Sequence, residues 1–246
     1  MSRRPTIDPA AAQGFARSAR AYERGRPGYP PEAIALLASR LPSGAEMLDL
    51  AAGTGALSRP LLEAGFEVTA VEPVAEMRAA LPATARVLEG TAEAIPLGTG
   101  EVDAAVVGQA FHWFDGDAAL SEIHRVLRPE GVLALFWNVR LLDHPVHAAI
   151  DDLIGPHRGD TPRHRSGAWR AAFDRTRLFD AGEEHVLPNS QELDAEGLAA
   201  RVGSTSFVAA LDPPARERVL GRARALAGDG TVTLPYRTEV LIWRRT

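Results

Sequence analysis

The sequence contains no cysteine and no lysine, so all 27 of its basic residues are arginine. The absence of cysteine excludes disulfide bonds, thiolate zinc sites and a cysteine nucleophile. The absence of lysine excludes a lysine Schiff base and the phosphate-binding lysine of a P-loop. Histidines are present, but none has a recognisable spacing to a carboxylate, so the sequence predicts no metal site.

Long apolar runs are also missing. None approaches the length that spans a bilayer, and the first 30 residues carry arginines without the apolar core of a secretory signal. The net charge of -5 argues against broad binding to nucleic acid, which needs a basic face. We therefore expect a cytoplasmic protein with neither a membrane nor a nucleic acid as partner, and no pattern indicates its oligomeric state.

Strand-like apolar runs alternate with helical stretches through the first half of the chain, as is typical of an α/β fold with a mostly parallel sheet. The helical stretches include residues 9–25 and "DAALSEIHRVLRPEG", residues 117–131. After residue 140 this rhythm changes: residues 144–176 and 193–228 have helical patterns, and "EEHVLPN" and "TVTLPYRTEVLIWRRT" have strand patterns. The prediction has three parts, which are a lid segment over residues 1–30, a cofactor-binding core over 31–140, and helical cap elements with the last strands of the same sheet over 141–246.

The stretch "LDLAAGTGALSRPLLEAGFEVTAVEP", residues 48–73, reads as a strand, a glycine turn, a helix and a second strand that ends in an acid. Gly53 and Gly55 let the backbone approach a ligand closely, and the helix after them presents free N–H groups at its start. Glu72 ends the second strand, where a carboxylate can accept hydrogen bonds from ribose hydroxyls. This pattern suits both a dinucleotide and S-adenosylmethionine.

Two departures from the dinucleotide fingerprint separate these cofactors. Ser58 stands where the fingerprint has its third glycine. Asp49 lies inside the strand before the turn, where its carboxylate can meet the ammonium of an amino-acid group directly or through water. Both departures favour S-adenosylmethionine, whereas an ordinary strand–turn–helix corner explains the glycines but neither Asp49 nor Glu72.

The sequence resembles the class I S-adenosylmethionine-dependent methyltransferases over most of its length. "LDLAAGTG" is similar to their first motif, "VEP" to the acidic second motif, "GTAEAIPL" to the adenine-side loop, and "VDAAVVGQAFHWFD" and "ALSEIHRVLRPEGVLALFWN" to the fourth-strand and post-core motifs. "YERGRPGYP" with "QAFHWFD" resembles the small-molecule subgroup of trans-aconitate methyltransferase-like proteins. The resemblance implies a doubly wound, mostly parallel seven-stranded sheet with an antiparallel last strand, an N-terminal lid and a helical cap.

The resemblance also implies which residues hold the cofactor. The methionine end would contact Ala51, Gly53, Gly55 and Gln109, the ribose would contact Glu72, and the adenine would contact Met77 and Ala92. Asp49, singled out above, would add a contact to the ammonium group at the methionine end. One position departs from the family: many relatives carry an aspartate just before the alanine of the adenine-side loop, and this chain has Thr91 there. Glu93 or a water is therefore expected to accept from the adenine amino group.

His112 follows the fourth predicted strand, at the edge where open α/β sheets bind ligands, and is the candidate catalytic residue. It would act as a base or as a hydrogen-bond donor to substrate; alternatively, it only pins its loop. A hydroxyl acceptor needs a base, whereas a carboxylate acceptor does not. The candidate lid and substrate residues are Tyr22, Arg26, Tyr29 and Trp113, and an arginine among them can hold a carboxylate through two hydrogen bonds.

The function expected from the sequence is methyl transfer from S-adenosylmethionine to a small molecule, at an oxygen of a carboxylate or hydroxyl. N- or C-methylation, a non-catalytic regulator that binds S-adenosylmethionine, and a nicotinamide oxidoreductase are the alternatives. Methylation of a macromolecule is disfavoured, because the chain has no Asn/Asp-Pro-Pro-aromatic motif for nucleic-acid amino groups and no cysteine for attack on a pyrimidine.

Overall fold

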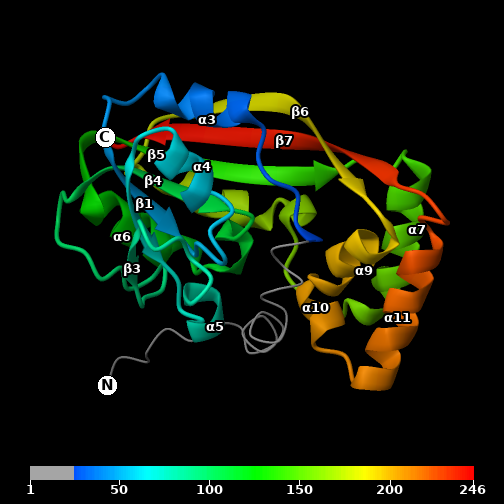
Figure 1. The fold of residues 1–246 in the computed structure, drawn as a ribbon. Coiled ribbons are helices and arrows are strands. Elements are labelled where there is room, and N and C mark those ends of the chain that lie inside the picture. Colours follow the sequence, from blue (N-terminus) through cyan, green and yellow to red (C-terminus); the bar gives the residue numbers. More distant parts are fainter. Residues whose placement is uncertain (1–24) are drawn as a thin grey trace.

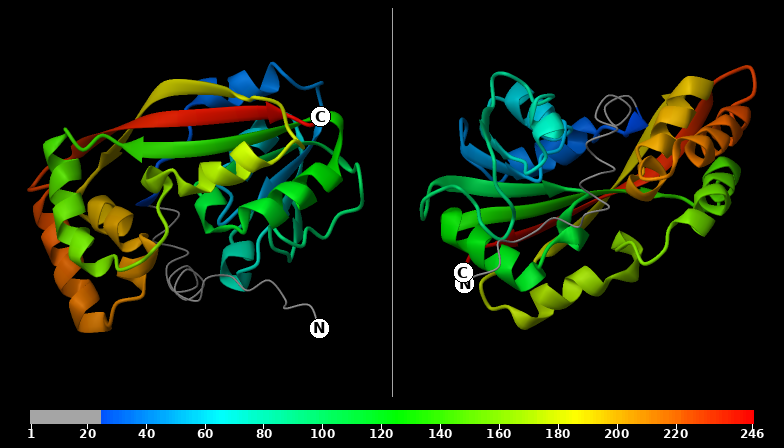
Figure 2. Two further views of the ribbon diagram at one scale, coloured as in Figure 1. Left: turned by 180° about the vertical axis from the view of Figure 1, so that it is seen from behind. Right: turned by 90° about the horizontal axis from the view of Figure 1, so that it is seen from below.

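The computed structural model describes residues 25–246, which form one seven-stranded sheet with helices on both faces (Figures 1 and 2). The strand order is β3-β2-β1-β4-β5-β7-β6. Strands β1 to β5 are parallel, β7 is antiparallel to β5, and β6 is antiparallel to β7. The predicted doubly wound, mostly parallel sheet with an antiparallel last strand is therefore confirmed.

The strands are β1 (Glu46–Leu50), β2 (Glu67–Val71), β3 (Arg86–Leu88), β4 (Val102–Gly108), β5 (Leu127–Arg140), β6 (Glu183–Leu193) and β7 (Val232–Arg244). The α-helices are α3 (Pro31–Ala38), α4 (Ser58–Glu63), α5 (Ala75–Arg78), α6 (Gly116–Val126), α7 (Pro145–Ile154), α8 (Ala171–Arg175), α9 (Ala195–Gly203), α10 (Ser206–Ala209) and α11 (Pro213–Ala225). Short 3₁₀ turns are η1 (Phe111–Trp113), η2 (Gly155–His157), η3 (His164–Ser166) and η4 (Ala168–Arg170).

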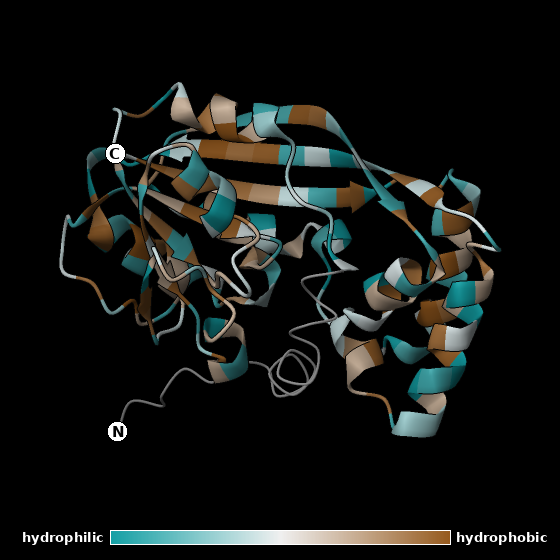
Figure 3. Cartoon of the chain, viewed as in Figure 1, coloured by the Kyte–Doolittle hydropathy of each residue, from teal (hydrophilic) through white to brown (hydrophobic). Residues whose placement is uncertain are grey.

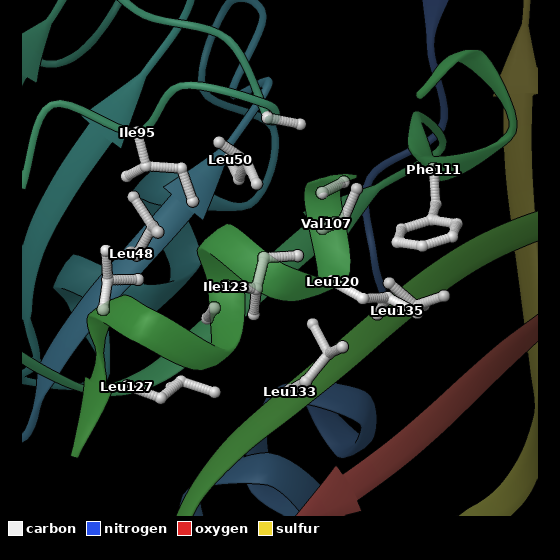
Figure 4. Packing of buried hydrophobic residues seen from close by; sticks show 14 of the residues in the cluster. Leu48, Leu50, Ile95, Val107, Phe111, Leu120, Ile123, Leu127, Leu133 and Leu135 are labelled. Carbon is white, nitrogen blue, oxygen red and sulfur yellow. The ribbon is translucent and has the colours of Figure 1, made fainter. Parts of the chain in front are cut away.

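The core has a layer on each face of the sheet. On one face, Leu120 and Ile123 of α6 pack against apolar side chains of the parallel strands (Figure 4). On the other face, α3 and α4 cover the same strands with Ile34, Leu37 and Leu61. The hydropathy colouring shows the brown, apolar stretches of the long central strands between these layers (Figure 3). Burial on both faces explains why these strands are continuous apolar runs.

A third apolar cluster lies under the helices of the cap. It joins α7, α9 and α11 to the ends of β6 and β7, through residues that include Ile154, Leu198, Leu220 and Leu234. Figures 1 and 2 show α7, α9, α10 and α11 gathered beyond one end of the long strands β5, β6 and β7. The cap thus faces the carboxyl end of β5, at Arg140.

One boundary was wrong in the sequence prediction. A helix was expected over residues 117–131, but α6 ends at Val126 and β5 begins at Leu127. Leu127 already pairs with Val102 of β4, and the register shifts before the main run of pairs begins. Pro129 cannot continue the helix because it has no N–H, and Glu130 adopts a left-handed φ of 62°.

The predicted helix over residues 9–25 lies outside the described residues except for its last position, and Tyr22 lies outside them too. Within residues 25–246, no helix has the length and apolar character needed to cross a membrane.

Candidate active site

The turn after β1 has a strained backbone that faces the crevice at the carboxyl edge of the sheet. Ala51 and Gly53 adopt left-handed φ values of 55° and 58°. Glycine tolerates this conformation, whereas for alanine it costs of the order of 1 kcal/mol or more. Strain of this kind persists where the surrounding structure enforces it, and it concentrates at ligand sites.

Glu72, at the end of β2, holds this turn in place. One carboxylate oxygen, Oε2, accepts from the Gly53 N–H at 2.9 Å, and Oε1 accepts from the Val74 N–H at 2.9 Å. The side chain is 5% exposed. Burial raises the pKa of Glu72, while the two amide hydrogen bonds and Arg78 oppose that rise. Each oxygen keeps a further lone pair, so Glu72 can bind a ligand while it fixes the turn.

Asp49 is buried beside this turn and meets Ser58, the residue that replaces the third glycine of a dinucleotide site. The Ser58 hydroxyl donates to Asp49 Oδ2 at 2.6 Å. Burial raises the pKa of Asp49 to about 7; the Ser58 hydrogen bond opposes the rise and the nearby Glu72 adds to it. A buried carboxyl group with such a pKa is suited to bind a cation, because a nearby positive charge would favour its ionised form.

If the ammonium group of S-adenosylmethionine binds at Asp49, this pKa predicts that cofactor affinity depends on pH. Binding of an ammonium group to ionised Asp49 lowers the carboxyl pKa, so below pH 7 binding must release a proton. We expect the Kd of S-adenosylhomocysteine to rise about tenfold from about pH 8 to about pH 6. Calorimetry across this range measures the slope, and calorimetry in buffers of different ionisation enthalpy measures the proton released.

The matched variant for this prediction is Asp49→Asn, which cannot ionise. Its affinity should be weaker and nearly constant over the same range. A wild-type affinity that stays constant from pH 8 to pH 6 would show that the ammonium does not bind at Asp49.

The predicted adenine side is assembled from α5 and the loop after β3. Met77 and Ala92 are buried, and the Thr91 hydroxyl is buried without a hydrogen-bond partner among the described residues. Glu93 Oε1 accepts from the Asp115 N–H at 3.0 Å, at the start of α6. Glu93 therefore holds the loop against α6 through one of its carboxylate oxygens.

A cavity of about 310 Å³ opens at the carboxyl ends of β1, β4 and β5. It brings together eight residues singled out in the sequence: Arg26, Tyr29, Asp49, Ala51, Gly53, Gln109, His112 and Trp113. The described lining does not include the remaining predicted site residues, which are Gly55, Glu72, Met77, Thr91, Ala92 and Glu93. These lie along the crevice on the β2–β3 side.

The segment before α3 is held against the sheet by a polar cluster. Asn138 of β5 donates to the carbonyl of Gly28 at 3.1 Å and accepts from the hydroxyl of Thr238 at 2.6 Å. Asn189 of β6 donates to the same Gly28 carbonyl at 2.8 Å. Next to it, the Tyr29 ring packs edge-on against Phe136, with ring centroids 5.5 Å apart. These contacts place Arg26 and Tyr29 in the cavity wall.

Gln109 lies at the end of β4 in a left-handed conformation, with φ of 58°. Its backbone N–H still donates to the Phe136 carbonyl at 2.9 Å, so the strained residue is held by the neighbouring strand. Gly108 precedes it, and a Cβ at that position would lie 2.7 Å from the Tyr29 hydroxyl. The end of β4 is therefore packed closely under the segment that carries Tyr29.

His112 lines the cavity from η1, with its ring centroid 5.2 Å from that of Trp137. Its Nδ1 is buried without a hydrogen-bond partner among the described residues. The pKa of His112 is lowered to about 3, mainly by burial and also by the charges of His164 and Arg26. Base catalysis by His112 would call for a pKa near the ordinary imidazole value of about 6.5, so the lowered pKa disfavours that role.

Sequence reasoning singled out Arg26 among the arginines of the cavity and missed the others. These arginines are Arg26, Arg140, Arg158, Arg163, Arg165 and Arg201. His164 also lines the cavity, stacked on Trp137 at 4.2 Å between ring centroids and 3.4 Å from Glu239 Oε2 through Nε2. The position of Arg140 could have identified it from the sequence, because it ends the fifth strand at the ligand-binding edge. The other missed arginines belong to the cap, and no sequence pattern pointed to them.

A seven-stranded sheet of this order, with a glycine turn after β1 and an acid after β2, defines the class I methyltransferase fold. The methyltransferase domain family matches residues 48–135. An uncharacterized methyltransferase of Mycobacterium tuberculosis (strain H37Rv) is 41% identical over 239 residues, which are 91% of this chain and 92% of the relative. The chain belongs to the class I S-adenosylmethionine-dependent methyltransferases and is an enzyme of that class.

Two further similarities bear on structure and chemistry. The solved structure of a protein described as a type II methyltransferase, from Anaeromyxobacter dehalogenans, has a TM-score of 0.63 and 28% identity, covering 89% of this chain and 96% of that one. A malonyl-[acyl-carrier protein] O-methyltransferase of Pectobacterium atrosepticum is 40% identical over 131 residues, which are 51% of each chain. The first supports the fold over nearly the whole chain, and the second covers about half of it.

Proposed function

We propose that this enzyme methylates a carboxylate oxygen of a small anionic molecule. The observation that carries the proposal is the charge of the acceptor side of the cavity, where arginines outnumber acids. In the described lining the acidic side chains are Asp49, on the cofactor side, and Asp151. An acid would be drawn to such a wall, whereas an amine in its protonated form would be repelled.

The crevice at β1 and β2 suits S-adenosylmethionine in three respects. The left-handed turn at Ala51 and Gly53 exposes backbone to the methionine end, and Asp49 offers a carboxylate to its ammonium group. Glu72 has lone pairs left for the ribose hydroxyls, and the partnerless hydroxyl of Thr91 suits the adenine edge. When bound, S-adenosylmethionine supplies a methyl group that is activated by its positively charged sulfur.

The remaining predicted contacts belong to the same proposal. Gly55 would complete the turn around the methionine end, Met77 and Ala92 would flank the adenine, and Gln109 would face the methionine group. Arg26, Tyr29 and Trp113 would close the acceptor side. Residues 1–30 would serve as a lid over residues 31–140, with residues 141–246 as cap and last strands.

A carboxylate acceptor agrees with the chemistry of the two cavity histidines. Burial lowers the pKa of His112 to about 3 and also lowers that of His164, whose partner Glu239 opposes the shift. A ring with the lowered pKa of His112 is a poor proton acceptor at neutral pH. An ionised carboxylate has no proton to remove, so no base is needed. The arginine-lined side of the cavity would attract and orient the acceptor, and His112 would help to position the acceptor. Effective molarity from such positioning can contribute up to ~7–11 kcal/mol.

Product formation with a panel of small acids, amines and alcohols tests the acceptor class. We expect S-adenosylhomocysteine release with acids, and a product that mild alkali hydrolyses back to the acid, as it does a methyl ester. A panel in which amines or alcohols are methylated and acids are not would overturn the carboxylate assignment while leaving the methyltransferase class intact. The O-methyltransferase name of the Pectobacterium relative supports oxygen as the acceptor atom.

His112→Gln separates positioning from base catalysis. With S-adenosylmethionine saturating, the wild-type rate should be flat from about pH 5 to about pH 8, because the neutral imidazole already predominates above its pKa of about 3. The variant should mainly raise the acceptor KM, and its rate should fall by far less than the ~10²–10⁴-fold expected for loss of a general base. Single-turnover rates on an identified acceptor measure both. A wild-type limb near pH 6.5 that disappears in the variant would restore His112 as the base.

A further inference from the structure

At the far end of the cavity, two arginines share one carboxylate. Arg140 ends β5, Asp151 lies on α7, and Arg158 follows η2. Arg140 Nη2 and Arg158 Nη2 lie 2.7 Å and 2.9 Å from the same oxygen, Asp151 Oδ1. Their side chains are only 18% and 15% exposed, and that of Asp151 is 27% exposed. The three side chains line the cavity that also contains Asp49 and His112.

This cluster has more positive than negative charge. Arg201 of α9 also lines the cavity, and its Nε donates to the Tyr236 hydroxyl at 3.1 Å. The pKa of Arg140 is lowered to about 10, mainly by burial and also by the charge of Arg201, while Asp151 opposes the shift. A single carboxylate therefore does not neutralise the guanidinium groups around it, and in a partly buried site that surplus favours a second anion.

The location of the cluster gives it access to a bound acceptor. The tip of β5 faces α7, α9 and α10 across the end of the sheet (Figures 1 and 2). Thr205 and Ser206 line the same cavity and add hydroxyl groups. Asp49 and Gly53 line it from the end of β1 and the turn that follows, whereas Arg140 lines it from the end of β5. A molecule whose reacting oxygen is directed toward the cofactor would extend its other end toward Arg140 and Arg158.

We propose that Arg140, Arg158 and Arg201 form a subsite for a second acidic group of the acceptor, remote from the methylated oxygen, and that Asp151 is the internal counter-ion that competes with this group. The inference rests on the proposed function, since it concerns the acceptor of the same reaction. Asp151 then determines specificity. It holds the arginines in position, and an acceptor binds there only if its anionic group makes better contacts than the internal carboxylate allows.

The opposite role for Asp151, as the ligand of a cationic acceptor, fits the geometry less well. Two guanidinium groups donate to one oxygen of its carboxylate, and Arg201 adds a further positive charge in the same cavity. A cation would have to compete with the arginines for Asp151 and would face their repulsion. The charges thus favour an anion beside Arg140 and Arg158.

The test measures the binding of two probes, succinate and inorganic phosphate, to the full chain saturated with S-adenosylhomocysteine. Asp151→Asn removes the competing charge but keeps the shape and one acceptor oxygen. We expect this variant to bind the preferred probe at least several-fold more tightly than the wild type, and to gain more thermal stability from it. Arg158→Gln should bind the probe about tenfold or more weakly, the scale of a lost charge-assisted hydrogen bond. Tighter binding of succinate would assign a carboxylate to the second group, and tighter binding of phosphate a phosphoryl group.

Matched variants control for net charge. Asp152→Asn, the exposed neighbour on α7, and Arg222→Gln, on the exposed side of α11, change the charge by the same amounts away from the cavity. Both should bind the probes as the wild type does. An Asp151→Asn protein that binds both probes no more tightly than the wild type, or an Arg158→Gln protein with unchanged affinity, would overturn the subsite.

Failure of the subsite is distinguishable from failure of the proposed function. If acids are methylated but neither Asp151→Asn nor Arg158→Gln alters probe binding, the acceptor class stands and the subsite is wrong. If both variants shift probe affinity as expected while acids are not methylated, the subsite stands and the assigned acceptor atom is wrong. S-adenosylhomocysteine affinity, measured separately, should be unchanged in both variants, because neither residue lies at the β1–β2 edge.

Discussion

Replacing Gly53 by valine should abolish binding of S-adenosylmethionine and S-adenosylhomocysteine. Gly53 has a φ of 58°, and a β-branched residue with that φ is a genuine outlier. Its N–H donates to Glu72 Oε2 at 2.9 Å, so a shift of the backbone to relieve the strain would also break the contact between the turn and β2. The valine side chain would project from the one stretch of backbone that must approach the ligand. We expect calorimetry to show affinity lowered by more than about 100-fold, which is more than about 2.7 kcal/mol.

Gly44→Val is the matched control for this loss. Gly44 has a similar left-handed φ of 71°, lies before the opposite end of β1, and has open space where its Cβ would be. It should lower the free energy of unfolding through backbone strain, yet leave cofactor affinity unchanged. If a folded Gly53→Val protein binds the cofactor as well as Gly44→Val does, the turn after β1 is not the binding site.

Changing Glu72 to glutamine should weaken cofactor binding almost as much as removing the side chain. Both carboxylate oxygens accept from backbone N–H groups, those of Gly53 and Val74. A glutamine would direct its NH₂ group at one of these backbone N–H groups. At that position one hydrogen bond would be lost and two donors would point at each other. The ribose would also lose a charged acceptor. We expect affinity to fall by about 1–3 kcal/mol, together with a lower free energy of unfolding.

Glu67→Gln, at the exposed start of the same strand, is the control for Glu72→Gln. It removes the same charge from β2 at the edge of the sheet away from the site, and both affinity and stability should be close to those of the wild type. Equal affinities for Glu72→Gln, Glu67→Gln and wild type would mean that the ribose contact is assigned to the wrong residue.

Local patterns in the sequence were sufficient for the fold and for the meeting of Gly53 and Glu72 at one edge of the sheet. The alternation of apolar strands with helices predicts a parallel sheet, and the positions of Asp49, Gly53 and Glu72 relative to their strands predict a shared edge. These features depend on backbone periodicity and turn chemistry, which neighbouring residues determine. The helix expected to continue to Gly131 was wrong because tertiary pairing of Leu127 with Val102, together with Pro129, favoured the strand.

The acceptor side could not be predicted from the sequence in this way. Arg140, Asp151, Arg158 and Arg201 come from a strand, two helices and the segment after a 3₁₀ turn, with no shared spacing in the chain. His112 was identified, but its pKa was not, because burial and the charges of His164 and Arg26 act through space. The sequence by itself determined the class of fold and the edge of the sheet at which Asp49, Gly53 and Glu72 lie, since short-range patterns encode them. Only the tertiary structure decided which distant charges share a cavity, because electrostatic energy depends on separation and burial rather than on position in the chain.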